Sequence, residues 1–319
     1  MPRKNIWLAI QAVGTVVLLA VLFRGFDWPR FGDVLRQMSL AFYVGSLVAM
    51  GAGQLLYAMR WRVVLAGMGV AVSYREVLRQ YLIGLFFTNV MPTAVGGDAA
   101  KVYYLGRREG YVEIGASVFI DRFLGFLWLS VIGAALAWIV PADSPLLVLN
   151  RNLLTLFAAG FVVALIVARL VPLAGLIERV FPERWRGAAV KLTSFDALVR
   201  RGVLRLLTIL VAGAVVAGFA ALIAIVYRYH FAANGVAAVT MPVVMLVIVS
   251  MSIFVNVPIS VNGIGLREQL HVLLFTGLGV PKEVSVSLSL LLFAHQLLLS
   301  LIGCALWLRV RPVLPATPA

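Results

Sequence analysis

Charged residues are scarce in this sequence. Asp, Glu, Lys and Arg together make up 13% of the 319 residues, while 62% of the residues are hydrophobic. A soluble domain is about one quarter charged and about one half apolar. The mean hydropathy is +1.02, and no long polar stretch is present that could form a second, soluble domain. The sequence therefore predicts a single membrane domain over residues 1–319.

Cysteine and histidine are scarce as well. Cys304 is the only cysteine, so an internal disulfide cannot form. The histidines (His230, His271 and His295) are scattered and lack the spacing of a metal site. We therefore expect no metal, no other cofactor and no catalytic residues, and the sequence favours a transporter over an enzyme.

Acidic residues are fewer than basic ones, which gives a formal net charge of +14. In a soluble protein such an excess would suggest nucleic acid as the partner. Here the basic residues lie between apolar runs, where anionic headgroups and the positive-inside rule account for them. We therefore expect membrane lipids with anionic or lipid-linked headgroups as partners, and no nucleic acid.

Long uncharged runs are what the sequence has in abundance. A helix of about 20 apolar residues spans the hydrocarbon core of a bilayer. We expect the first run to be a retained helix, because it lacks the small-residue cleavage site of a signal peptide. The sequence thus predicts an all-α integral membrane protein with six full spans. Runs long enough to span, or nearly so, cover residues 6–23, 40–59, 123–140, 152–168, 206–227 and 284–308.

Two further apolar runs are interrupted by helix-breaking residues. Pro and paired Gly end helices, and irregular backbone at membrane depth is tolerated only against protein or water. We interpret both runs, near 80–108 and 240–278, as re-entrant hairpins. The interrupting residues are Asn89, Pro92, Gly96 and Gly97 in the first run and Asn256, Pro258, Asn262, Gly263 and Gly265 in the second.

The basic loops predict the orientation. Residues 169–205 hold eight basic and three acidic residues, and residues 60–79 are also basic. Six crossings and two hairpins place both segments on the same side as the two termini. By the positive-inside rule this side is cytoplasmic, so we expect a multi-pass protein of the bacterial cytoplasmic membrane with cytoplasmic N- and C-termini.

The two interrupted runs also resemble each other, which predicts two repeats, about 1–140 and about 152–308. Asn89 and Asn256 lie 167 positions apart, and the neighbouring spans match at similar offsets. Each repeat contains three crossings, so the second must be inverted relative to the first, as in many secondary transporters. The alternative is that such breaks recur by chance.

Five ionisable residues lie closest to membrane depth: Asp98, Asp121, Arg122, Arg267 and Glu268. An unpaired charge there costs about 2.5–3.5 kcal/mol or more, so we expect one buried cluster. Asp121 and Arg122 are adjacent on a helix and cannot pair well with each other. Asp121 would suit Arg267, and Arg122 would suit Asp98 or Glu268. Two interpretations stay open: a charge lattice that joins the halves, or direct contact with a substrate.

The glycines of the breaks precede two short helices, which start near Asp98 and Leu266. A helix N-terminus can hold a phosphate, and Lys101 and Arg267 add positive charge; alternatively, the glycines only allow tight packing. Arg60 and Trp61 are interpreted as anchors at the membrane surface. The candidate substrate-binding residues are Asn89, Pro92, Gly96, Gly97, Asp98, Lys101, Asp121, Arg122, Asn256, Asn262, Gly263, Gly265, Arg267 and Glu268.

Four motifs follow one another along the chain: Arg60-Trp61, Phe-Phe-x-Asn-x-x-Pro-x-x-x-Gly-Gly-Asp ending at Asp98, Asp121-Arg122, and Ser-x-Asn-Gly-x-Gly-x-Arg-Glu ending at Glu268. In this order they resemble the lysylphosphatidylglycerol synthase transmembrane-domain family, which is also described as flippase-like. In fused relatives this domain is coupled to a soluble domain that aminoacylates phosphatidylglycerol, and the membrane part is held to move the product to the outer leaflet. We expect the aminoacyl-transferase domain to be missing here, so the resemblance does not imply synthesis.

We expect this protein to translocate, or flip, a lipid or lipid-linked substrate with a charged headgroup. One alternative is an integral-membrane transferase that uses a polyprenyl-phosphate-linked donor, with Asp27 and Asp33 of the loop 24–39 as its acids. Another is a non-catalytic partner of a lipid-synthesis enzyme.

Overall fold

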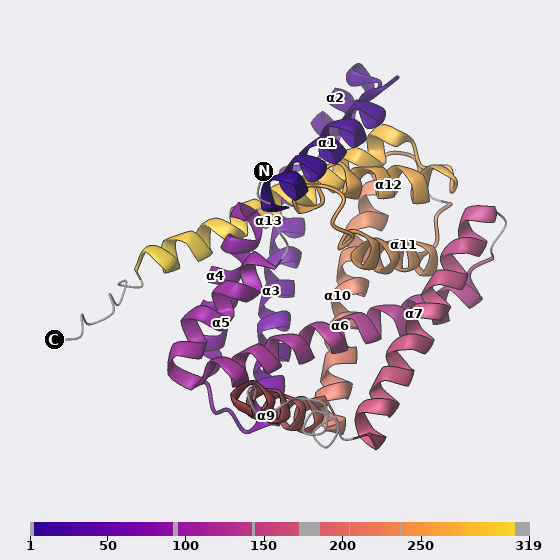
Figure 1. Cartoon of the computed structure of the whole chain (residues 1–319). Coiled ribbons are helices and arrows are strands. Elements are labelled where there is room, and N and C mark those ends of the chain that lie inside the picture. The colour runs from indigo at the N-terminus through magenta and orange to yellow at the C-terminus, as the bar shows by residue number, and fades with distance from the viewer. Residues whose placement is uncertain are drawn as a thin grey trace.

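A computed structural model describes residues 3–91, 95–141, 144–171, 186–203, 205–236 and 238–309, and these residues form helices and the loops that join them (Figure 1). The helices are α1 (Arg3–Phe23), α2 (Trp28–Gln37), α3 (Leu40–Met68), α4 (Tyr74–Val90), α5 (Gly96–Glu109), α6 (Tyr111–Ile139), α7 (Pro145–Leu170), α9 (Arg186–Val203), α10 (Leu206–Ala233), α11 (Met241–Phe254), α12 (Leu266–Thr276) and α13 (Lys282–Leu308), with a 3-10 turn at Val261–Gly263.

Five of the described helices are long and apolar enough to cross a membrane: α3, α6, α7, α10 and α13. Helices α3, α7, α10 and α13 each contain one of the predicted spans, and α6 covers all but the last residue of the run 123–140; each helix is longer than predicted. Their outer surfaces carry many exposed large apolar side chains, which is expected of helices that face hydrocarbon. The prediction of an all-helical, multi-pass membrane protein is therefore confirmed.

The first predicted span, residues 6–23, lies within α1, whose segment Ile10–Phe23 has the length and hydropathy of a span only together with α2. The pair is bent by 89°. Gly25 has a positive φ of 64°, and the Asp27 side chain caps α2 by accepting a hydrogen bond from the Arg30 backbone N–H. The described residues thus contain five spans, or six if the bent pair counts as one. A helix also replaces most of the predicted loop 24–39.

The first interruption falls where the sequence predicts it, between the end of α4 at Val90 and the start of α5 at Gly96. The two helices pack closely, because a methyl group on Gly97 would overlap Thr88 Oγ1 and the Gly84 carbonyl oxygen. The sequence left open why glycine stands at position 97, and this close contact is one reason. Whether α4 and α5 return to the membrane face from which they start stays a prediction, as do the inverted repeats.

The second interruption separates α11 from α12 and is held by α1. The Val261 N–H donates to Thr15 Oγ1 at 2.9 Å, and Gln11 Nε2 donates to the Pro258 carbonyl oxygen at 3.4 Å. Asn262 adopts a left-handed conformation with φ 51°. Non-helical backbone at membrane depth needs partners from the protein, and α1 provides them here.

The middle of the molecule is built by α3, α6 and α10, with α6 running across α3 and α10, and α13 packs against α3 and α4 (Figure 1). A side chain on Gly53 of α3 would overlap the Phe219 ring of α10. On α13, a side chain on Gly303 would overlap the Leu82 carbonyl of α4. These contacts let α3 approach α10 and α13 approach α4, while Gly125 of α6 faces Arg60 of α3, whose Nη1 would lie 3.1 Å from an added Cβ.

We predict that Gly97→Ala lowers the free energy of unfolding by about 1–3 kcal/mol, the usual cost of overpacking. The matched control is Gly115→Ala on α6, where an added methyl meets nothing within 4 Å and alanine favours the helix. Thermal unfolding of both variants in detergent measures the difference. Equal midpoints for Gly97→Ala and the wild type would contradict the α4–α5 contact.

Candidate functional site

A cavity of about 300 Å³ lies among α3, α4, α5, α6 and the end of α11. Five charged side chains line it: the cations Arg60, Lys101 and Arg122 and the carboxylates Asp98 and Asp121. We call it the charged cavity. A cluster of this kind inside an apolar bundle is costly unless its members pair or have a function.

The central contact of the charged cavity is a two-pronged ion pair between α3 and α6. Arg60 Nε donates to Asp121 Oδ1 at 2.7 Å, and Arg60 Nη2 donates to Asp121 Oδ2 at 2.8 Å. Both side chains are 9% exposed. Such paired, charge-assisted hydrogen bonds fix the geometry as well as compensate the charge.

This ion pair corrects two predictions. Asp121 pairs with Arg60 and not with Arg267, and Arg60 is a buried cavity residue and not a surface anchor. The predicted span 40–59 stops before Arg60 because the uncharged run ends at that residue, whereas α3 continues to Met68. The apolar run that resumes at residues 63–66 was the signal for a longer helix.

Asp98 is shared by two cations. It lies in the first turn of α5, where Lys101 Nζ approaches its Oδ1 at 3.4 Å from one turn further along the helix. The Nε of Arg122 on α6 donates to Oδ2 of the same carboxylate. Asp98 with Arg122 was one of the two pairings expected for that arginine. The charged cavity therefore has three cationic groups against two carboxylates.

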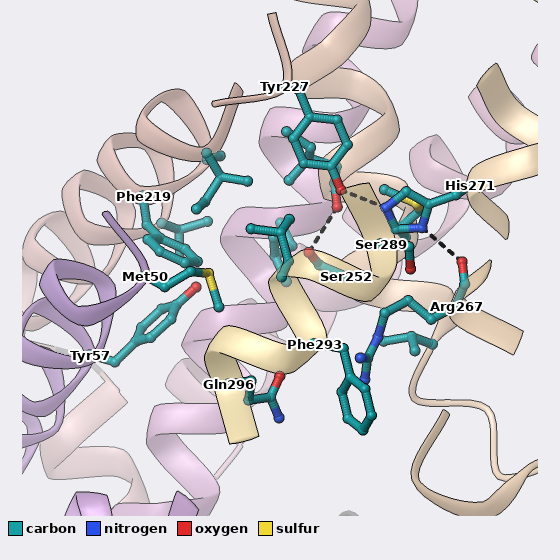
Figure 2. A pocket seen from close by; sticks show the side chains of 18 residues that line it. Met50, Tyr57, Phe219, Tyr227, Ser252, Arg267, His271, Ser289, Phe293 and Gln296 are labelled. Carbon is teal, nitrogen blue, oxygen red and sulfur yellow. Dashed lines mark hydrogen bonds between the residues drawn. The ribbon is translucent and has the colours of Figure 1, made fainter. Parts of the chain in front are cut away.

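A second cavity, of about 190 Å³, lies next to the first, and Figure 2 shows its lining. Most of its wall is apolar, with Met50 and Phe219 on one side and Phe293 on the other. We call it the apolar cavity. Tyr57 and Ser252 line both cavities, so the two adjoin through a shared wall.

Polar groups enter the apolar cavity from α10, α12 and α13. The Arg267 guanidinium lies 4.8 Å from the Phe293 ring centroid, a cation–π contact. Tyr227 Oη and His271 Nε2 are 2.6 Å apart, and His271 Nδ1 donates to the Arg267 carbonyl oxygen at 2.8 Å (Figure 2). In the neutral imidazole, Nε2 is then the acceptor for the tyrosine hydroxyl. No sequence pattern pointed to Tyr227 or His271.

The Glu268 carboxylate stabilises the start of α12. Its Oε2 accepts from the Gly265 N–H at 2.8 Å and its Oε1 accepts from Ser289 Oγ at 3.0 Å. Gly265, with φ 80°, is the residue before α12, so the carboxylate caps that helix at its positive end. Gly263, also with positive φ, is buried beside Arg267.

The five ionisable residues expected in one cluster are therefore divided. Asp98, Asp121 and Arg122 line the charged cavity, Arg267 lines the apolar cavity, and Glu268 is buried at the start of α12. The physical reason is that each acid finds a nearer partner on its own side: Asp121 finds Arg60, and Glu268 finds backbone and hydroxyl donors.

The two interruptions meet at Asn89. Its Oδ1 accepts from Asn262 Nδ2 at 3.5 Å and from Gln296 Nε2 at 3.1 Å. Asn89 and Asn256 each donate to the carbonyl oxygen four residues earlier, which satisfies the ends of α4 and α11. Asn256 also lines the charged cavity. Gly96 and Gly97 are buried against α4, and Pro92 lies outside the described residues.

We predict that Arg60→Ala lowers the free energy of unfolding by about 3–5 kcal/mol, because Asp121 would stay buried without its partner. The double change Arg60→Met with Asp121→Leu should recover most of this loss, since an apolar pair needs no counter-charge. Denaturant unfolding in detergent measures both. The control is Arg36→Ala, whose pair with Asp33 is 83% and 63% exposed and contributes at most about 1 kcal/mol. Similar losses for Arg60→Ala and Arg36→Ala would disprove the role of the buried pair.

Among the described residues, no group of three or more His, Cys, Asp or Glu side chains is arranged to hold a metal ion. The site geometry is instead that of an ion-paired cavity beside an apolar one.

Comparison with known proteins finds relatives that are named as membrane proteins. One is a UPF0104 membrane protein of Methanothermobacter thermautotrophicus, 31% identical over 172 residues, or 51% of this chain and 47% of that protein. The chain thus matches about half of that relative's length. Another is a UPF0104 membrane protein of Pyrococcus horikoshii, 25% identical over 87% of this chain and 88% of that protein. No solved structure matches the chain.

The profile of one family covers almost the whole sequence. The match runs over residues 6–303, and it includes all four motifs on which the resemblance was based as well as both cavities. On this evidence the chain belongs to the lysylphosphatidylglycerol synthase TM region family.

Proposed function

We propose that this protein moves a lipid with an anionic headgroup from one leaflet of the cytoplasmic membrane to the other. The observation that carries the proposal is the charged cavity, where three cations face two carboxylates. Both carboxylates are engaged by these cations, so the group keeps one excess positive charge. A phosphate-bearing headgroup has the charge and the acceptor oxygens that suit it.

The apolar cavity supports the amphipathic nature of the substrate. It adjoins the charged cavity through Tyr57 and Ser252 and has Arg267 on its far side. A headgroup that moves between Arg122 and Arg267 would meet a cation at both stages. The hydrocarbon tails would stay in the bilayer, because the long helices expose many large apolar side chains on their outer surfaces.

The two helix interruptions support a transport mechanism. Interrupted helices that meet near the middle of a transporter are typical of binding sites between repeats, and the interruptions here meet at Asn89 and Asn262. We infer that the two repeats, about 1–140 and about 152–308, rock against each other around the cavities. We also infer cytoplasmic termini, because basic residues gather at the end of α3 and the start of α4 (Arg62, Arg75 and Arg79) and on α9 (Lys191, Arg200 and Arg201).

The transferase alternative depends on Asp27 and Asp33, and both have local partners. Asp27 caps α2 through the Arg30 N–H, and Asp33 pairs with Arg36 one turn away. Neither lines the charged or the apolar cavity. A transferase assay with polyprenyl-linked donors is therefore the second experiment and not the first.

We predict that purified protein in liposomes accelerates the movement of headgroup-labelled anionic phospholipid, measured with a membrane-impermeant quencher. Arg122→Ala and Arg267→Ala should each slow it by about tenfold or more, the scale of one lost charge-assisted contact. The matched control is Arg201→Ala, an exposed arginine on α9, which should keep the wild-type rate.

Zwitterionic phospholipid, aminoacyl lipid and polyprenyl phosphate are tested in parallel. If no lipid class moves faster than in empty liposomes, the transport proposal is wrong. Full activity of both arginine variants would show that the charged cavity and the apolar cavity are not on the transport path.

A further inference from the structure

Lys101 lies in a site with the features of an ammonium-binding cage. Its Nζ is 4.3 Å from the ring centroid of Tyr81 and 5.3 Å from that of Trp61. Asp98 Oδ1 is 3.4 Å away on the same helix. Aromatic faces attract organic cations through the negative charge of the ring face, and a carboxylate adds a full counter-charge.

The cage is built into the fold. Trp61 is 1% exposed, and its Nε1 donates to Ser117 Oγ at 3.0 Å, so the indole is fixed. The Lys101 stem lies over Gly84, where an added Cβ would be 3.0 Å from Cε and 3.2 Å from Cγ. Glycine at position 84 thus leaves room for the lysine stem on its way to the rings.

The cage opens on the proposed binding site. Lys101, Tyr81 and Asp98 all line the charged cavity, so a headgroup in the cavity is next to the cage. The ammonium group of an amine-bearing headgroup would bind in this cage, but the Lys101 ammonium group already occupies it.

We propose that Lys101 makes the charged cavity selective for anionic headgroups, because it fills from within the chain a site that would otherwise bind an organic ammonium group. The cage itself is inferred from its own geometry; only the selectivity rests on the proposed function. Without Lys101 the cavity would hold two arginines against two carboxylates together with an empty aromatic cage. Its preference would then shift toward headgroups that carry an ammonium group.

The first experiment tests the cage without any lipid transport. Lys101→Ala removes three carbons and the nitrogen, the atoms of n-propylammonium. We expect millimolar n-propylammonium to raise the thermal midpoint of purified Lys101→Ala by about 2–4 °C and to leave the wild type unchanged. Neutral n-propanol should have no effect on either protein.

The matched control for the cage is Arg107→Ala. The Arg107 guanidinium lies 4.5 Å from the Tyr103 ring centroid, but both residues are exposed and neither lines a cavity described above. This variant should not respond to the amine. No response of Lys101→Ala, or an equal response of the wild type or Arg107→Ala, would overturn the cage.

The second experiment measures selectivity in the liposome assay with Lys101→Met, which keeps an apolar stem over Gly84 and also serves if Lys101→Ala does not fold. We expect the ratio of anionic to zwitterionic lipid movement to fall by about tenfold, the effect of one charge. An unchanged ratio would overturn the selectivity. Absence of lipid movement in the wild type would instead reject the transport proposal, while the amine result would still decide the cage.

Discussion

The cost of placing charge inside an apolar bundle is the constraint on which this structure depends. A lone arginine or aspartate at membrane depth is strongly unfavourable, and Arg60 and Asp121 offset each other by two short hydrogen bonds. Because one residue is on α3 and the other on α6, the pair joins the two helices that form most of the charged cavity. Asp98 then has its own cations, Lys101 and Arg122.

The same constraint applies to the backbone where the helices break. Carbonyl and N–H groups that leave a helix need other partners when no water is near. Thr15 and Gln11 of α1 form hydrogen bonds with the backbone of the second interruption. At the start of α12, the Glu268 carboxylate accepts from the Gly265 N–H. Several polar side chains thus serve to satisfy backbone groups at the helix breaks. Glu268, which the sequence presents as a candidate binding residue, is the clearest case.

What remains after these structural contacts is an uneven distribution of charge and apolar surface. One cavity has excess positive charge, and its neighbour is mostly apolar with a single arginine. Tyr57 stands between them, 5.0 Å from the Arg60 guanidinium on one side and 5.0 Å from the Phe219 ring on the other. A molecule that is both charged and apolar is complementary to this arrangement.

The sequence by itself determined the membrane class, the family, the five long spans and the positions of the two helix breaks. Hydropathy and Pro–Gly breaks are local properties, so they can be read from neighbouring residues. Only the tertiary structure decided the ion-pair partners. Asp121 meets a residue 61 positions away that seemed to end a span, and Tyr227 and His271 meet across 44 positions without any motif. Such pairings depend on how whole helices pack, as where Gly125 of α6 leaves room for the Arg60 guanidinium of α3, and no local pattern reports that packing.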